Sequence, residues 1–170
     1  MATSDDSAGA APESRTTVER VSDCELVVTR TVEGPARLVF RAWTQADLFR
    51  RWWVPASFPA TLLECTLDVR VGGGYRLTFG MPDVPPMSFF GTYLEVVPET
   101  RLVWTNEEAG EAGQVTTVTF LEDAGGRTRI VLRERYPTRE ALEEGVSSGS
   151  TDALPETFDQ LEALIGELRA

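Results

Sequence analysis

Two neighbouring segments carry the strongest structural signal, Trp43–Pro55, WTQADLFRRWWVP, and Asp68–Tyr75, DVRVGGGY. Adjacent tryptophans are unfavourable in water, so the first segment has to pack its indole rings in a core or against a cavity. The three consecutive glycines of the second segment permit backbone conformations that other residues avoid. We therefore expect a helix that ends before Pro55 and, soon after it, a tight reversal between two strands.

Upstream of the tryptophans, the segment Cys24–Val32 is rich in β-branched residues and predicts a strand that stops before Gly34 and Pro35. Pro35 suits the first turn of a helix. Apolar residues then recur at helical spacing in two short groups, Leu38–Trp43 and Leu48–Trp53. Two short helices are expected between the first strand and the rest of the sheet.

Downstream, β-prone segments alternate with turn residues. The Pro-rich stretch 81–86 is expected to be a loop tip, and Asp123–Gly126 a hairpin turn. The predicted strands are Leu62–Val71, Tyr75–Phe79, Met87–Val97, Arg101–Asn106, Gln114–Glu122 and Arg127–Arg135.

The C-terminal segment predicts an amphipathic helix. Its apolar positions at helical spacing are Leu154, Phe158, Leu161, Ile165 and Leu168. Pro155 would interrupt any longer helix from Leu142 onward, so we expect a break or kink there. The order of elements predicts an α+β fold, a curved antiparallel sheet of about six to seven strands around a long C-terminal helix.

Composition sets the domain organisation. Residues 1–20 are small, polar and acidic, which predicts a disordered acidic tail before a single domain at residues 21–170. No signal peptide follows Met1 and no segment reaches the roughly 20 apolar residues of a membrane helix. A soluble, cytoplasmic protein is expected.

Charge and residue counts narrow the chemistry. A net charge of −11 would repel nucleic acids and anionic membranes, so neither is an expected partner. The chain has no histidine, which removes Ser-His-Asp and Cys-His catalysis and imidazole metal ligands. Cys24 and Cys65 are isolated and show no metal-ligand spacing. We expect neither a metal nor a cofactor.

Five blocks in order give the chain a specific resemblance. They are TRTVEGPARLVFRAWTQADLFRRWWVP, DVRVGGGYRLTF, GTYLEVVPETRLVWT, GGRTRIVL and ETFDQLEALI. Together they resemble bacterial proteins named for similarity to the activator of the Hsp-90 ATPase, members of the START-like, or SRPBCC, helix-grip superfamily. The resemblance spans Cys24 to Leu168. One departure lies at Ser150, Ala153 and Pro155, where many relatives are rich in glycine and methionine, and it leaves the shape of the helical wall open.

The resemblance implies a ligand cavity between the sheet and the C-terminal helix, without an assigned reaction. We expect a small apolar or aromatic molecule as partner. An alternative is an enzyme of the polyketide cyclase or aromatase type, and another is regulation of a chaperone ATPase. Exposed apolar strand edges or helix faces would also allow a homodimer.

Candidate ligand contacts are chosen from aromatic and apolar positions of the predicted sheet and helices. Most of them have a second interpretation as ordinary core, and Trp52 and Trp53 are expected to divide, one buried and one at a pocket rim. The candidates are Trp52, Trp53, Phe58, Tyr75, Phe79, Phe89, Tyr93, Trp104, Phe120, Tyr136, Val146, Leu154 and Phe158.

Glu134 is the weak catalytic candidate. Strand alternation places it on the same face as Ile130 and Leu132, so its carboxylate would end an apolar face. Desolvation there would raise its pKa and allow it to act as an acid, a base or a polar contact for a ligand. The alternative is a solvated strand end.

Overall fold

Eight strands and four helices make up the part of the chain that the structure describes. The structure is a computed structural model, and it describes residues 16–107, 113–149 and 151–170. The strands are β1 Thr16–Arg20, β2 Glu25–Val32, β3 Thr61–Leu67, β4 Gly74–Met81, β5 Val84–Val97, β6 Arg101–Asn106, β7 Gln114–Glu122 and β8 Thr128–Arg135. The helices are α1 Ala36–Thr44, α2 Ala46–Phe49, α3 Arg139–Ser147 and α4 Leu154–Arg169.

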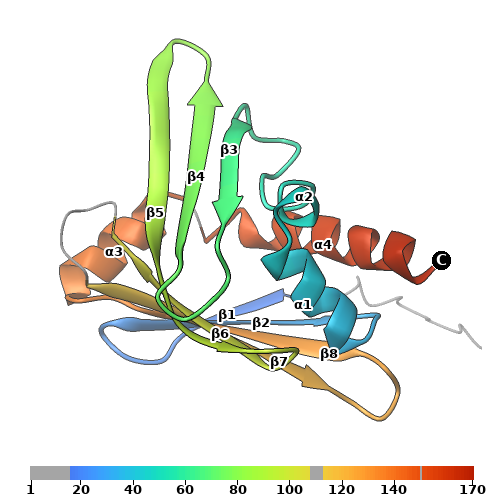
Figure 1. Ribbon diagram of the computed structural model, residues 1–170. Helices are drawn as coiled ribbons and strands as arrows, with labels where there is room; N and C mark the ends of the chain where they lie inside the picture. Colours follow the sequence, from blue (N-terminus) through green and yellow to red (C-terminus); the bar gives the residue numbers. More distant parts are fainter. Residues whose placement is uncertain (1–15, 108–112, 150) are drawn as a thin grey trace, which may run out of the picture.

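The strands form one antiparallel sheet in the order β1-β2-β8-β7-β6-β5-β4-β3. The sheet is strongly bent, because β3, β4 and the first part of β5 rise from a lower layer that contains β6, β7, β8, β2 and β1 (Figure 1). This bend separates two walls that face each other across the interior of the protein.

The bend lies within β5, which changes partner along its length. Its first part pairs with β4 as far as Thr92, and its second part pairs with β6 from Tyr93 onward, with an irregular register just after Tyr93. Gly91 stands at this junction, where a Cβ atom would lie 1.8 Å from the Thr105 carbonyl oxygen. A glycine is therefore required for β5 and β6 to approach so closely.

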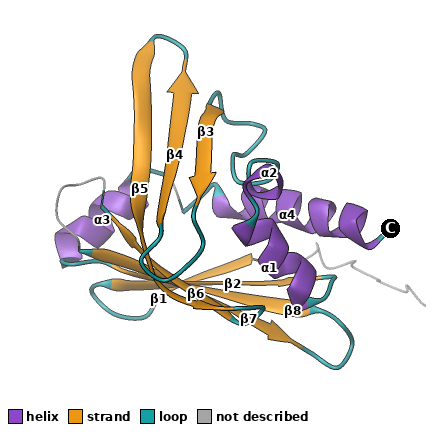
Figure 2. Cartoon of the chain, viewed as in Figure 1, coloured by secondary structure: helices purple, strands orange, loops and turns teal. Residues whose placement is uncertain are grey.

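The helices close the interior of the bent sheet. α1 contacts β7 and α4, and α4 also contacts β1 and β2, while α2 contacts β3. α3 lies at the opposite end of the lower layer from α1 (Figure 2). The buried face of α1 carries Leu38, Val39 and Trp43, and that of α4 carries Phe158 and Ile165. These residues share one continuous hydrophobic core with β2, β7 and β8.

The predicted α+β class and helix-grip arrangement are confirmed, with all seven expected strands and both short helices. The eighth strand, β1, corrects the expected disordered tail, because Thr16–Arg20 pairs along β2 and belongs to the sheet. Four of its five residues are exposed at the sheet edge, and an exposed edge strand can be polar. The polar sequence therefore did not indicate a strand. The rest of the expected tail, residues 1–15, lies outside the described residues.

Two expected loop boundaries are also corrected. The glycine segment does connect two paired strands, but β3 ends at Leu67, so residues 68–71 belong to the loop. Gly72 is the glycine there with a positive φ, 84°. At the Pro-rich tip, β5 begins at Val84 rather than Met87. Prolines are tolerated at this position because the register with β4 is irregular there.

The expected interruption before the C-terminal helix is confirmed. α3 ends at Ser147 and α4 begins at Leu154, with Pro155 in the first turn of α4. A proline at this position loses no helical hydrogen bond, since the first N–H groups of a helix have no partner within it. Pro155 therefore begins a new helix and does not kink a continuous one.

Candidate functional site

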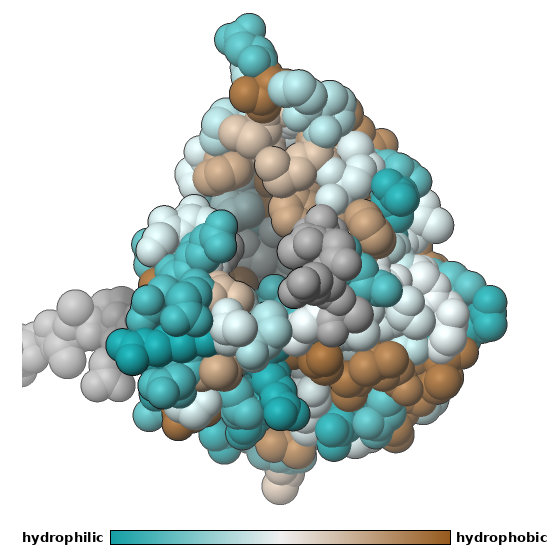
Figure 3. Space-filling view, turned by 90° about the vertical axis from the view of Figure 1, so that its left-hand side faces the viewer, coloured by the Kyte–Doolittle hydropathy of each residue, from teal (hydrophilic) through white to brown (hydrophobic). Residues whose placement is uncertain are grey.

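A cavity of about 280 Å³ lies between the bent sheet and the helices. Residues from all six strands β3 to β8 line it, together with residues of α1, α2 and the start of α4. Figure 3 views the molecule from the side on which α3 and β5 lie in Figure 1, and the surface is hollowed near the middle of this face. Most of the lining is aromatic or aliphatic, which is typical of sites for small apolar molecules.

The sheet wall of the cavity is built by strand alternation and by pairing across the bend. Tyr75, Leu77 and Phe79 alternate along β4 and all line the cavity. Tyr93 of β5 lies opposite Trp104 of β6, with ring centroids 6.5 Å apart. Burial raises the pKa of the Tyr93 hydroxyl above its ordinary value of 10. Tyr93 therefore stays neutral at physiological pH.

The helical wall is formed by Trp43 of α1, Phe49 of α2 and Trp53 after α2. The rings of Phe49 and Trp53 stack at 4.8 Å, and Trp43 meets Trp53 edge to face at 5.9 Å. Trp52 is fully buried behind them and donates a hydrogen bond from Nε1 to the Ala42 carbonyl oxygen. The two tryptophans divide as expected, because Trp52 holds the helices together and the half-buried Trp53 faces the cavity.

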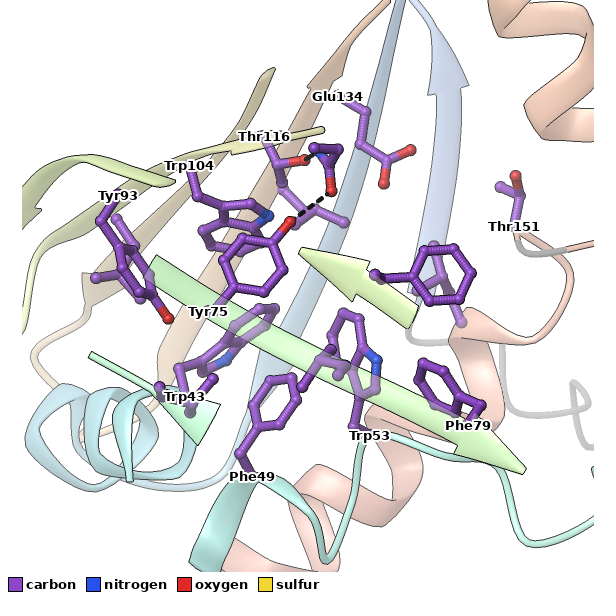
Figure 4. Close-up of a pocket in the computed structure, with 17 residues that line it drawn as sticks. Trp43, Phe49, Trp53, Tyr75, Phe79, Tyr93, Trp104, Thr116, Glu134 and Thr151 are labelled. Atoms are coloured by element: carbon purple, nitrogen blue, oxygen red, sulfur yellow. Dashed lines mark hydrogen bonds between the residues drawn. The ribbon is translucent and has the colours of Figure 1, made fainter. Parts of the chain in front are cut away.

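A small polar group lies at the other end of the cavity. Figure 4 shows Glu134 and Thr116 on the opposite side of the cavity from Trp43, Phe49 and Trp53. Asn106 lies beside them and donates from Nδ2 to the Thr116 hydroxyl oxygen over 3.0 Å.

The Asn106 side chain is fixed from its other end as well. Its carbonyl oxygen accepts a hydrogen bond from the Tyr75 hydroxyl over 3.0 Å, and that hydroxyl also lies 2.8 Å from the Thr105 carbonyl oxygen. Three polar side chains of the cavity are thus joined in one network.

Glu134 reaches the cavity because of its position on β8. It follows Ile130 and Leu132 on the inner face of the strand and lies directly opposite Thr116 of β7. Burial raises the pKa of Glu134 above its ordinary value of 4.5, and a hydrogen bond from the Tyr136 hydroxyl, 3.1 Å from Oε2, opposes this rise. Of the two interpretations of Glu134, the end of an apolar face agrees with this position in the cavity lining.

The structure brings eight of the fourteen candidate site residues to the cavity. These are Trp53, Tyr75, Phe79, Phe89, Tyr93, Trp104, Leu154 and Glu134. Their roles as ligand contacts or catalytic groups stay predictions.

The other six candidates lie elsewhere. Trp52, Phe120 and Phe158 are buried in the core behind the cavity wall. Tyr136 packs with Leu26 and Leu142 in a second core cluster, and its hydroxyl donates a hydrogen bond to Glu134 of the cavity. Phe58 and Val146 are exposed, by 52% and 43%. Aromatic or apolar character alone did not separate these positions from the cavity lining.

Nine lining residues were missed by the sequence reasoning. They are Trp43, Phe49, Leu67, Leu77, Leu102, Asn106, Thr116, Leu132 and Thr151. Alternation signals some of them, since Leu77 lies between Tyr75 and Phe79, and Leu132 lies two residues before Glu134. Thr116 carries no such signal, because its place beside Glu134 follows from the pairing of β7 with β8.

The sequence matches the family described as "Activator of Hsp90 ATPase homolog 1-like protein" over residues 33–166. This chain belongs to that family. The match begins three residues before α1, ends within the last turn of α4, and thus includes every element that lines the cavity. The expected resemblance is confirmed. A comparison with curated proteins gives no significant match.

Solved structures share the fold of this family member. A protein from Rhodobacter sphaeroides is similar with a TM-score of 0.81 and 20% identity, over 90% of this chain and 99% of that one. A protein from Nitrosomonas europaea gives a TM-score of 0.77 and 24% identity, over 87% and 97%. An AHSA1-like protein from Aeromonas hydrophila gives 0.64 and 22%, over 81% and 92%. At these identities the similarity concerns the fold.

None of the helices in the described part of the chain has the length and apolar character needed to cross a membrane. Within residues 16–107, 113–149 and 151–170, no cluster of three or more cysteine, aspartate or glutamate side chains is arranged to hold a metal ion.

Proposed function

We propose that this family member binds a small apolar or aromatic molecule in the cavity between the sheet and the helices. The observation that carries the proposal is the aromatic lining of a preformed cavity of about 280 Å³. Rings from both the sheet and the helices border this space, including Tyr75, Trp104, Trp43 and Trp53. Flat or apolar molecules pack well against such rings.

The size of the cavity favours a small ligand. Its volume of about 280 Å³ lies just below the range of roughly 300–1,000 Å³ typical of small-molecule sites. Affinity would come from apolar burial, worth about 25 cal/mol for each Å² removed from water. Orientation would come from the few polar side chains, with Glu134 and Tyr93 as the foremost.

A test uses naphthylmethanol, a neutral aromatic alcohol, in isothermal titration calorimetry with the purified protein. Saturable binding is expected. Leu77→Trp should abolish it, because Leu77 lines the cavity and is 5% exposed, so that a larger ring would fill the space. Leu121→Trp is the matched control, since Leu121 is exposed near the end of β7. Equal binding to both variants would contradict the proposal, as would a wild-type protein that binds neither naphthylmethanol nor its amine and carboxylate analogues.

A second candidate function is an enzyme of the polyketide cyclase or aromatase type. The observation that favours it is Glu134, whose carboxyl group lines the cavity and has a pKa raised by burial. A carboxyl group with a raised pKa is suited to proton transfer as an acid or a base. The chain has no histidine to take that role. Loss of product formation in Glu134→Gln with unchanged substrate binding would support this function.

Regulation of a chaperone ATPase is a proposal that rests on the family's name. The direct test is whether the protein changes the ATPase rate of a purified Hsp90, and an unchanged rate would contradict it. A homodimer and a cytoplasmic location also remain predictions from the sequence.

A further inference from the structure

Glu134 is the one charged side chain among the described residues that line the cavity. It accepts a hydrogen bond from Tyr136, and it forms no ion pair within the described chain. The fold does pair a charge that is fully buried. Arg30, 4% exposed, has an Nη2 atom 2.8 Å from Asp159 and 2.7 Å from Glu162. Glu134 thus differs from Arg30, because no basic side chain in the described part of the chain pairs with it.

The neighbouring polar groups do not compensate Glu134. Asn106 donates to Thr116 and accepts from Tyr75, and among the described residues neither Asn106 nor Thr116 forms a hydrogen bond with Glu134. Tyr136 reaches only Oε2 of Glu134, so Oε1 accepts no hydrogen bond from the residues that the structure describes. The Glu134 side chain is partly buried, and a ligand that fills the cavity would remove its carboxylate from the remaining water, which is strongly unfavourable without a partner. The partner it lacks is a hydrogen-bond donor, and a cation would compensate it most.

The rest of the cavity also suits a cation more than an anion. All sixteen basic residues of the chain are arginines, and none of those in the described part lines the cavity. Aromatic faces attract cations within about 6 Å of the ring. Tyr75 and Trp104 lie on the same side of the cavity as Glu134 in Figure 4. The net charge of −11 adds a general repulsion of anions.

We propose that the cavity selects an aromatic or apolar amine, whose ammonium group pairs with Glu134 while its apolar body packs among the aromatic rings. This inference rests on the proposed function, since it assigns the chemical class of the ligand in the same cavity. Carboxylates such as fatty acids are excluded, because their charge would meet Glu134 without a cation to balance either group.

Three probes that share a naphthalene ring test the preference for an amine and the exclusion of a carboxylate. Naphthylmethylamine, naphthylmethanol and naphthoate are titrated into the wild-type protein by calorimetry. The amine is expected to bind about tenfold or more tightly than the alcohol, as a charged hydrogen bond of about 1.5–3 kcal/mol implies, and the carboxylate to bind weakest. These three affinities are measured on the wild-type protein, so the comparison does not depend on the folding of any variant.

Glu134→Gln then identifies the group responsible. In this variant the amine should lose its advantage and bind with about the affinity of the alcohol. Glu25→Gln is the matched control, since Glu25 of the adjacent strand β2 pairs with Arg133 and does not line the cavity. If the alcohol binds and the amine binds no better, or if Glu134→Gln leaves their ratio unchanged, the inference is wrong while cavity binding stands. Failure of all three probes would overturn the proposed function itself.

Discussion

The indole Nε1 of Trp52 donates a hydrogen bond to the Ala42 carbonyl oxygen over 2.9 Å. Ala42 lies in the last turns of α1 and Trp52 follows α2, so this bond ties the two short helices together. The Trp52 ring also packs edge to face on Trp43, with centroids 4.8 Å apart. Trp52 thereby positions Trp43 and Trp53, which form the helical wall of the cavity.

Trp52→Phe should lower the free energy of unfolding by about 2–4 kcal/mol, because it opens a void in the core and removes the hydrogen bond to Ala42. Urea denaturation measures the change. Trp53→Phe is the control and should cost about 1 kcal/mol or less, since Trp53 is only half-buried and makes no hydrogen bond from its indole within the described chain. Equal losses in the two variants would contradict the distinction between them.

Arg30→Ala should lower the free energy of unfolding by about 3 kcal/mol. The reason is that the buried guanidinium joins β2 to Thr16 of β1 and to Asp159 and Glu162 of α4. Arg51→Ala provides the matched comparison, because Arg51 also pairs with α4, through Glu167, but at the exposed surface. This second loss should stay below about 1 kcal/mol. Thermal unfolding measures both losses, and a loss for Arg51→Ala as large as that for Arg30→Ala would contradict the prediction.

Gly91→Ala should destabilise the fold by more than about 2 kcal/mol, because the new Cβ would collide with the Thr105 carbonyl oxygen at the bend of β5. Gly166→Ala is the opposite case. Gly166 lies within α4, where no atom would lie within 4 Å of a Cβ, so alanine should stabilise the helix by about 0.5–1 kcal/mol. Chemical denaturation of both variants measures whether the free energy of unfolding falls or rises. An unchanged stability in Gly91→Ala would contradict the requirement for glycine at the bend of β5.

The raised pKa of Glu134 predicts that this residue lowers the free energy of unfolding in a pH-dependent way. Between its ordinary value of 4.5 and the higher folded-state pKa, the folded protein retains a proton that the unfolded chain has released. The free energy of unfolding therefore falls as pH rises through this window. Glu134→Gln removes the effect, so the stability of the variant relative to wild type should increase from about pH 4 upward and then level off.

Urea denaturation at a series of pH values tests this prediction. Tyr136→Phe provides a second reading, because it removes the hydrogen bond that lowers the pKa of Glu134 and should extend the window to higher pH. A stability difference between Glu134→Gln and wild type that does not vary with pH would count against the burial of this carboxyl group.

The fold was largely predictable because its signals are local. Strand-forming residues marked seven strands, hydrophobic periodicity marked the C-terminal helix, and turn residues such as Gly126, with φ 77°, marked strand ends. The strand β1 was not predictable in this way, since its stability comes from pairing with β2 rather than from its own polar sequence. The Pro85–Pro86 segment was likewise misjudged, because an irregular ladder accommodates prolines that a regular one would exclude.

The site was only partly predictable. Alternation placed Glu134 on the inner face of β8 correctly, because the period of a strand depends on the backbone alone. Which aromatic residues border open space is a different question. Phe120 and Phe158 have the same composition signal as Phe79 and Phe89, yet the first two are core and the last two line the cavity. The difference lies in what packs against each ring.

The amino-acid sequence was sufficient for the family, the α+β class, the order of the elements after β1 and the shared face of Ile130, Leu132 and Glu134, since each depends on periodicity or on motifs in fixed order. Three features depended on the folded arrangement: the bend of β5 at Gly91, the place of Thr116 beside Glu134, and the division between Trp52 and Trp53. All three arise from contacts between segments far apart in the chain. Such contacts depend on strand pairing and close packing, and a local pattern does not record them.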